Sequence, residues 1–143
     1  MIPEFDAKGV LPTGIYRAKW QEIVKRFGGN RQRQELLRGL KEALELLRRA
    51  GCRRVYLDGS FVTDKESPND IDVCWDIDGV DPMSLDSIFF DFDNERAAQK
   101  AKFGAEFFPA QAPQRLKTFL DFFQIDKATG EPKGIIELLL DDG

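Results

Sequence analysis

The strongest constraint on the fold is a clear alternation of side-chain character in residues 71–77. A period of two places successive side chains on opposite faces of a β-strand. One face of this strand is apolar and needs a covering layer, and the other carries Asp72 and Asp76 with Cys74 between them. The segment therefore predicts a half-buried strand with an acidic face. At Cys74 we expect a small buried side chain rather than a reactive thiol.

Helical periodicity dominates the part of the chain before this strand. A long helix is predicted over residues 31–50, because Asn30 can cap its start and Gly51 lies just past its end. A shorter helix is predicted over residues 16–27, and Gly28 ends it. The long helix needs a packing partner because it carries an apolar stripe of Leu36, Leu37, Leu40, Ala43, Leu44 and Leu47.

The order of the predicted elements indicates the fold class. The remaining predicted elements are a strand over 53–57, a helix over 95–107 capped by Asn94, and a strand over 117–125. Residues 135–140 are predicted to form a last strand, with a helix as the alternative. Helices come first, and strands with an inserted helix follow, which predicts an α+β (or α/β) fold. A length of 143 residues predicts one domain over 1–143, with residues 1–14 as an extended arm.

The composition excludes several functional classes. Histidine is absent, which excludes Ser-His-Asp and Cys-His nucleophilic chemistry, and two cysteines are too few for a zinc cluster. No apolar run reaches the roughly 18 residues of a membrane span. The first residues also lack the pattern of a signal peptide. We therefore expect a cytoplasmic protein with no membrane partner.

The net charge of −4 is unevenly distributed, because residues 1–56 carry a net +7 and residues 57–143 a net −11. Acidic and basic faces that pair within one domain are one explanation. A basic face for a phosphate-rich partner and an acidic cluster for a divalent metal are the other. The basic residues of 31–49 are expected to solvate the outer face of the helix, and RNA binding by that face is a weaker alternative.

Candidate chemistry lies in Gly59-Ser60 and in the pair Asp70 and Asp72. On a strand, the two aspartates project from one face, with backbones about 6–7 Å apart. A divalent cation such as Mg²⁺ or Mn²⁺, which prefers oxygen ligands, makes such a pair tolerable. Gly59 lets the backbone approach a phosphate closely, and the Ser60 hydroxyl can donate to it. The pattern predicts a metal and nucleoside triphosphate site; the alternative for Asp70 is a turn residue after Pro68.

These residues resemble a known superfamily. The order strand, Gly-Ser, loop and Asp-x-Asp is similar to that of the nucleotidyltransferases, which include DNA polymerase beta and the minimal nucleotidyltransferases of bacteria. Residues 59–73 more closely resemble a family of small uncharacterised bacterial proteins with the motif GSFVTxKxxPNDIDV. The resemblance implies a small mixed sheet flanked by helices.

The resemblance also implies a third carboxylate on a later strand. Asp121 lies in the matching apolar setting and would complete the triad as metal ligand or base; Glu137 is a weaker candidate. Minimal nucleotidyltransferases usually have a small residue and an arginine after Gly-Ser, whereas this chain has Phe61-Val62-Thr63. The first basic residue here is Lys65, which is expected to help Gly59 and Ser60 hold phosphates.

Two functions follow as expectations. The first is a Mg²⁺- or Mn²⁺-dependent enzyme that moves a nucleotidyl group from a nucleoside triphosphate to a hydroxyl on a protein, RNA or small molecule. Asp70, Asp72 and Asp121 would be its catalytic and metal-binding residues. The second is an inactive module of the same fold that binds a protein partner, for instance in a toxin–antitoxin or phage-defence pair.

Overall fold

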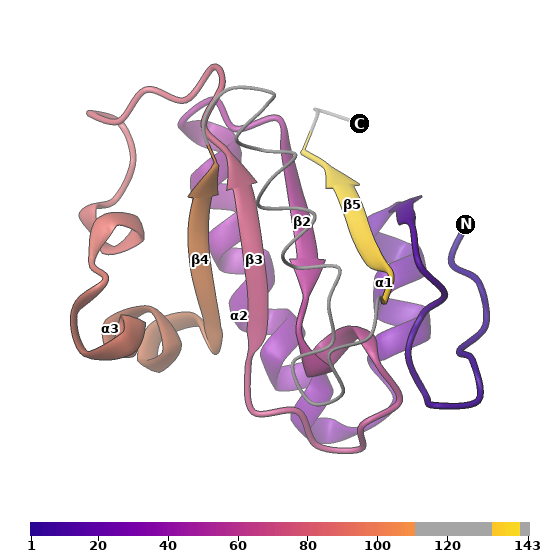
Figure 1. Ribbon diagram of the computed structural model, residues 1–143. Coiled ribbons are helices and arrows are strands. Elements are labelled where there is room, and N and C mark those ends of the chain that lie inside the picture. The colour runs from indigo at the N-terminus through magenta and orange to yellow at the C-terminus, as the bar shows by residue number, and fades with distance from the viewer. Residues whose placement is uncertain (111–132, 141–143) are drawn as a thin grey trace.

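The computed structural model describes residues 1–110 and 133–140 of the chain. Its elements are, in chain order, β1 (Ile15–Ala18), α1 (Trp20–Phe27), α2 (Arg31–Arg49), β2 (Arg54–Asp58), the short 3-10 helix η1 (Ser60–Val62), β3 (Ile71–Asp76), the 3-10 helix η2 (Ser87–Phe90), α3 (Asp93–Phe103), β4 (Ala105–Ala110) and β5 (Ile135–Leu139). The predicted α+β class is confirmed, since a small mixed sheet is flanked by helices (Figure 1).

The five described strands form one sheet in the order β1-β5-β2-β3-β4 (Figure 1). The central strand β2 runs antiparallel to both β5 and β3. The edge strands β1 and β4 run parallel to their neighbours β5 and β3. Each edge strand therefore lies beside a strand that is distant in the sequence or separated from it by a helix.

The core lies between the sheet and the helices behind it. The apolar stripe of α2 is buried as predicted, and Leu40 and Leu47 are fully inaccessible. It belongs to the same cluster as Ile71, Val73 and Trp75, the apolar face of β3. Amphipathic character thus places α2 on the sheet (Figure 1). No helix in the described ranges combines the length and the apolar character that crossing a bilayer requires.

The N-terminal part of the predicted helix over 16–27 is wrong. Residues Ile15–Ala18 form β1, and the helix begins only at Trp20. The pairing partner of β1 is β5, more than 100 residues further along the chain. A window of local sequence cannot show such a partner, and the helical spacing from Trp20 to Phe27 extended the prediction too far.

The predicted helix over 95–107 also differs from the structure. Helix α3 ends at Phe103, and Gly104 follows in the left-handed conformation with φ of +68°. Asn94 does not cap the helix, because it lies in a left-handed turn with φ of +52°. Gly104 is the stop signal that the prediction missed, since a left-handed glycine ends many helices. Pro109 then fits within β4 because this strand is at the sheet edge.

Residues 1–14 contain no helix or strand, but they contact the core. Leu11 is fully buried, and the Phe5 ring packs against Phe27 with 6.3 Å between the ring centroids. The backbone N–H of Asp64 donates to the carbonyl oxygen of Gly9 at 2.9 Å. The arm therefore supports the loop that follows Gly59-Ser60.

Candidate carboxylate site

Three carboxylates meet at the β3–β4 edge of the sheet. Asp70 directly precedes β3, and Asp72 is its second residue. The parallel register places Glu106 of β4 opposite Asp72. One oxygen from each of Asp70, Asp72 and Glu106 lies within 4.8 Å of the others, and all three side chains are half-buried. This spacing allows one divalent cation to contact all three groups.

The carboxylates interact electrostatically. Burial is the main cause that raises the pKa of Glu106, and the negative charges of Asp72 and Asp70 raise it further. A hydrogen bond with Asp70 also favours the protonated form of Glu106. A shared proton relieves the repulsion between such groups, and a divalent cation would do so more fully. The closeness of the three carboxylates therefore disfavours the form in which all of them are ionised.

Basic side chains flank the same row of the sheet. On one side, Asp58 of β2 is the antiparallel partner of Asp72. Its Oδ1 lies 3.0 Å from Nζ of Lys133, and both side chains are buried. Lys133 thus balances the charge of Asp58. On the other side, the negative charges of Glu106 and Asp72 act on Arg96 of α3.

Gly59 lies against the carboxylate cluster. Its backbone has φ of +84° and ψ of −171°, a region that only glycine occupies readily. A Cβ atom at this position would lie 2.9 Å from Oδ2 of Asp72. Glycine is thus required both by the conformation and by the approach of the backbone to Asp72. The Gly-Ser and Asp-x-Asp parts of the motif are in contact.

The loop after Gly59 is held by the first turn of α2. Arg33 is buried, and its Nη1 donates to the carbonyl oxygen of Phe61 at 2.7 Å. Its Nη2 donates to the carbonyl oxygens of Thr63 and Lys65 at 2.8 and 2.6 Å. Burial lowers the pKa of Arg33. The expectation that the basic residues of this helix solvate its outer face is therefore wrong for Arg33, which organises the loop.

Two other residues at the start of α2 contact the same loop. Asn30 caps the helix as predicted, since its side chain accepts from the N–H of Arg33 at 2.8 Å. Its Nδ2 also donates to the carbonyl oxygen of Glu66 at 2.7 Å. Gln32 donates to the carbonyl oxygen of Pro68. The segment between the two parts of the motif is thus fixed to α2 along its length.

Ser60 and Lys65 lie on this loop in different environments. Ser60 is half-buried at the start of η1, and its carbonyl oxygen accepts from Oγ1 of Thr63 at 2.6 Å. Lys65 is exposed, and its backbone N–H donates to Oγ1 of Thr63 at 3.2 Å. Ser60 is therefore next to Gly59 and the carboxylates, whereas the side chain of Lys65 extends to solvent.

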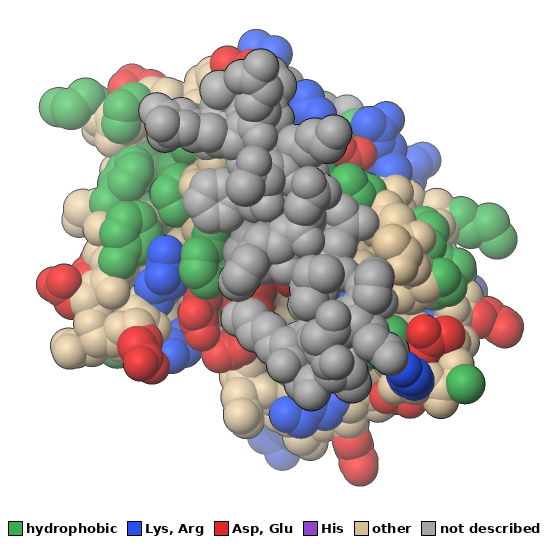
Figure 2. Space-filling view, in the orientation of Figure 1, with side chains coloured by type: hydrophobic (Ala, Val, Ile, Leu, Met, Phe, Trp, Pro, Cys, Tyr) green, Lys and Arg blue, Asp and Glu red, His purple; other side chains and the backbone are tan. Residues whose placement is uncertain are grey.

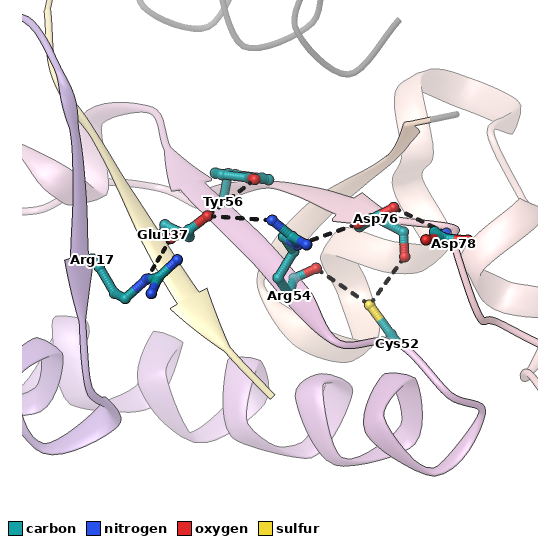
Figure 3. A network of polar contacts seen from close by, with 7 residues as sticks. All are labelled: Arg17, Cys52, Arg54, Tyr56, Asp76, Asp78 and Glu137. Atoms are coloured by element: carbon teal, nitrogen blue, oxygen red, sulfur yellow. Dashed lines mark hydrogen bonds and ion pairs between the residues drawn. The ribbon is translucent and has the colours of Figure 1, made fainter. Parts of the chain in front are cut away.

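The two other candidates for a third carboxylate have different outcomes. Asp121 lies outside the described residues, as does the predicted strand over 117–125. Glu137 of β5 belongs to a separate polar network, in which it accepts from Nε of Arg17 at 2.8 Å and from the hydroxyl of Tyr56 at 3.2 Å (Figure 3). Glu137 thus lies on the same face of the sheet as the carboxylate cluster, but its partners there are Arg17 and Tyr56.

The thiols add no nucleophile to the site. Cys74 is buried on β3, as expected, and burial raises the pKa of its thiol to about 12. Burial likewise raises the pKa of Cys52 to about 12, and its Sγ lies 3.4 Å from the carbonyl oxygens of Arg54 and Asp76 (Figure 3). Both thiols are therefore protonated near neutral pH, which excludes thiolate catalysis by them.

Glu106 and Arg96 are the site residues that sequence reasoning missed. Both fell within the predicted helix over 95–107, where charged residues are ordinary. The signal for Glu106 was Gly104 followed by the short run Ala105–Ala110, which contains two phenylalanines and a proline. No local signal indicates Arg96, because only the packing of α3 beside β4 brings it to the cluster.

The fold and the site together define an α+β protein with a three-carboxylate cluster at the edge of a mixed sheet. The chain belongs to DUF6932, a family of unknown function, which it matches over residues 3–139. No curated protein and no solved structure matches the chain. The function is therefore argued from the site.

Proposed function

We propose that this protein is a Mg²⁺- or Mn²⁺-dependent nucleotidyltransferase. It would move a nucleotidyl group from a nucleoside triphosphate to a hydroxyl on a protein, an RNA or a small molecule. The acceptor oxygen would bond to the α-phosphorus, and pyrophosphate would leave with the broken α–β bond. The supporting observation is the convergence of Asp70, Asp72 and Glu106, whose oxygen atoms lie within 4.8 Å of one another. Hard divalent cations bind carboxylate oxygens, and sites of this composition serve phosphoryl chemistry.

Each side chain has a defined role in this proposal. Asp70 and Asp72 would hold the cation, and Glu106 would be a third ligand, whose raised pKa makes metal binding weaker at lower pH. Asp121 remains a further ligand or base, as the resemblance implies. When bound, the cation would neutralise phosphate charge and favour attack by the acceptor hydroxyl.

The loop supplies the phosphate side of the proposed site. The backbone of Gly59 lies beside Asp72, so a phosphate bound there would adjoin the metal ligands. Ser60 offers a hydroxyl next to this backbone, and Lys65 offers a positive charge from the exposed surface of the loop. The contacts of Arg33 to the loop carbonyls support this role, because they hold the backbone in one conformation.

The proposal includes a cytoplasmic location. Nucleoside triphosphates are available in the cytoplasm, and the two free, buried cysteines are compatible with a reducing compartment. The acceptor hydroxyl belongs to a second substrate, and a partner protein is one such acceptor.

The substitution Asp72→Asn tests the proposal. It removes one charge and one hard ligand and keeps the shape of the side chain. Without metal, we expect the variant to be at least as stable as the wild type, because repulsion in the cluster decreases. The wild type should gain about 1.4 kcal/mol at a Mg²⁺ concentration ten times the dissociation constant, and the variant should lose this gain. Calorimetry with and without millimolar Mg²⁺ measures both effects.

A matched control is Asp78→Asn, which removes the same charge from an exposed position after β3. It should respond to Mg²⁺ as the wild type does. An identical response of the wild type and Asp72→Asn would contradict the proposal. It would leave the inactive, partner-binding module as the remaining candidate.

A further inference from the structure

Several contacts fix the guanidinium of Arg96 beside the carboxylate cluster. Its guanidinium carbon lies 4.0 Å from the ring centroid of Phe108 and 4.7 Å from that of Phe92. Its Nε donates to the carbonyl oxygen of Phe107 at 3.0 Å. Contacts with two aromatic rings and one hydrogen bond to a backbone carbonyl therefore hold the plane of the guanidinium in place.

The strand geometry relates this position to the proposed metal ligands. Glu106 and Phe108 are two residues apart on β4, so their side chains project from the same sheet face. Arg96 contacts the ring of Phe108, and the charges of Glu106 and Asp72 act on it. On this side of the molecule, hydrophobic, basic and acidic side chains adjoin one another over α3 and β4 (Figure 2).

The aromatic surface next to Arg96 is partly open to solvent. Phe90 and Phe92 are 43% and 42% exposed, although both are large apolar side chains. The Phe90 ring lies edge-on to Trp75 with 5.9 Å between the centroids, so it continues the core outward to the surface. Of these two rings, Phe92 lies against the guanidinium of Arg96, which is therefore next to a partly exposed aromatic side chain.

A fixed cation beside a cation site has a specific electrostatic consequence. It repels a bare divalent ion and so weakens metal binding, but it attracts a ligand that brings several negative charges with the metal. A guanidinium also matches the oxygens of a phosphate with two parallel N–H donors. This arrangement favours a metal–polyphosphate complex over the metal alone.

We infer that Arg96 is the residue that binds the phosphates of the substrate. The inference rests on the proposed function, because it assigns the phosphate ligand of that same site. Phe92 and Phe108 position the guanidinium, and the Nε bond to Phe107 orients Nη1 and Nη2 as the donors.

The test compares two ligands in three proteins by isothermal titration calorimetry. The ligands are MnCl₂ alone and inorganic tripolyphosphate in the presence of MnCl₂, which carries the charge of a triphosphate without a base. The proteins are the wild type, Arg96→Met and Arg26→Met. Methionine retains apolar contact between aromatic rings and removes the charge.

Arg26 is a close structural control. Its guanidinium carbon lies 4.5 Å from the Phe5 ring centroid and 5.9 Å from that of Phe27, and its Nη2 donates to the carbonyl oxygen of Pro3 at 2.7 Å. Arg26 belongs to α1, which lies behind the β1–β5 end of the sheet, whereas β4 is at the opposite end (Figure 1). Arg26→Met therefore loses the same kinds of contact away from the carboxylates.

The expected result has opposite signs for the two ligands. Arg96→Met should bind tripolyphosphate with Mn²⁺ at least about tenfold more weakly, the scale of a charge-assisted hydrogen bond. It should bind Mn²⁺ alone as tightly as the wild type or more tightly. Arg26→Met should match the wild type with both ligands.

Two results would overturn the inference and leave the proposed function standing. One is unchanged tripolyphosphate binding by Arg96→Met. The other is an equal loss of Mn²⁺ and tripolyphosphate binding, which indicates that Arg96 acts only through the fold. If the wild type binds neither ligand, the proposed function fails with it.

Arg96→Lys makes the test independent of how well the methionine variant folds. Lysine keeps the charge and loses the planar pair of donors. It should bind Mn²⁺ as the wild type does and bind tripolyphosphate more weakly, but more strongly than a variant without charge. Wild-type tripolyphosphate affinity in a folded Arg96→Lys protein would contradict the assignment.

Discussion

Gly59 is the single residue on which both parts of the sequence motif depend. Its positive φ and its extended ψ are compatible with glycine and unfavourable for other residues. The absence of a side chain also permits the approach to Asp72. The backbone conformation and the close approach to Asp72 therefore both require glycine at position 59.

We predict that Gly59→Ala destabilises the protein by about 1–3 kcal/mol, the cost of a strained backbone conformation. The new Cβ must also displace Asp72, so the response of the melting temperature to Mg²⁺ should decrease. Chemical denaturation measures the first effect and calorimetry the second. The control is Gly29→Ala, where a Cβ would meet no atom within 4 Å. An equal, small effect of both substitutions would contradict the strained geometry at Gly59.

Helix α2 connects the core to the candidate site. Its buried stripe packs in the main core cluster, which fixes the helix on the sheet. Its first turn then presents Asn30, Gln32 and Arg33 to the carbonyl groups of the loop. One element therefore supplies both much of the core and the support of the loop between Gly59 and Asp70.

We predict that Leu40→Ala costs about 2–5 kcal/mol of unfolding free energy, because Leu40 is fully buried and leaves a cavity. Urea denaturation monitored by circular dichroism measures the loss. Lys41→Ala, at the neighbouring exposed position, should change stability by less than about 0.5 kcal/mol. A loss below about 1 kcal/mol for Leu40→Ala would show that the helix packs differently in solution.

The whole sheet determines the charge of the site. Asp58, Asp72 and Glu106 come from three strands, and the pairing register places them in one row. Lys133 balances one end of this row and Arg96 lies near the other. Burial raises the pKa of Glu106, and the negative charges of Asp72 and Asp70 raise it further, so this carboxyl loses its proton at a higher pH in the metal-free folded protein than in the unfolded chain.

This difference predicts a pH dependence of stability. Because the folded-state pKa of Glu106 is raised, its contribution to stability is greatest at acidic pH and is lost as pH rises through that pKa. Glu106→Gln cannot titrate, so without metal its stability relative to the wild type should increase from pH 5 to pH 8. Thermal unfolding across this range, with exposed Glu42→Gln as control, measures the trend. A parallel pH profile for Glu106→Gln and wild type would contradict the raised pKa.

Local periodicity was sufficient to predict much of the fold. The period of the leucine stripe predicted α2 with its Asn30 cap, and the alternation of residues 71–77 predicted β3 with its acidic face. The strands over 53–57 and 135–140 correspond to β2 and β5 within one residue at each end. These elements were predictable because each pattern records which side of the element is buried.

The partners across the sheet were decided only by the tertiary structure. Strand β1 exists because β5 pairs with it, and Glu106 joins Asp70 and Asp72 because β4 aligns with β3 in one register. Arg33 reads as a surface residue in the sequence, yet carbonyl groups some 30 residues away bury it. Local side-chain pattern determines which face of an element is buried, whereas pairing register and buried polar contacts depend on backbone groups that meet only when the chain has folded.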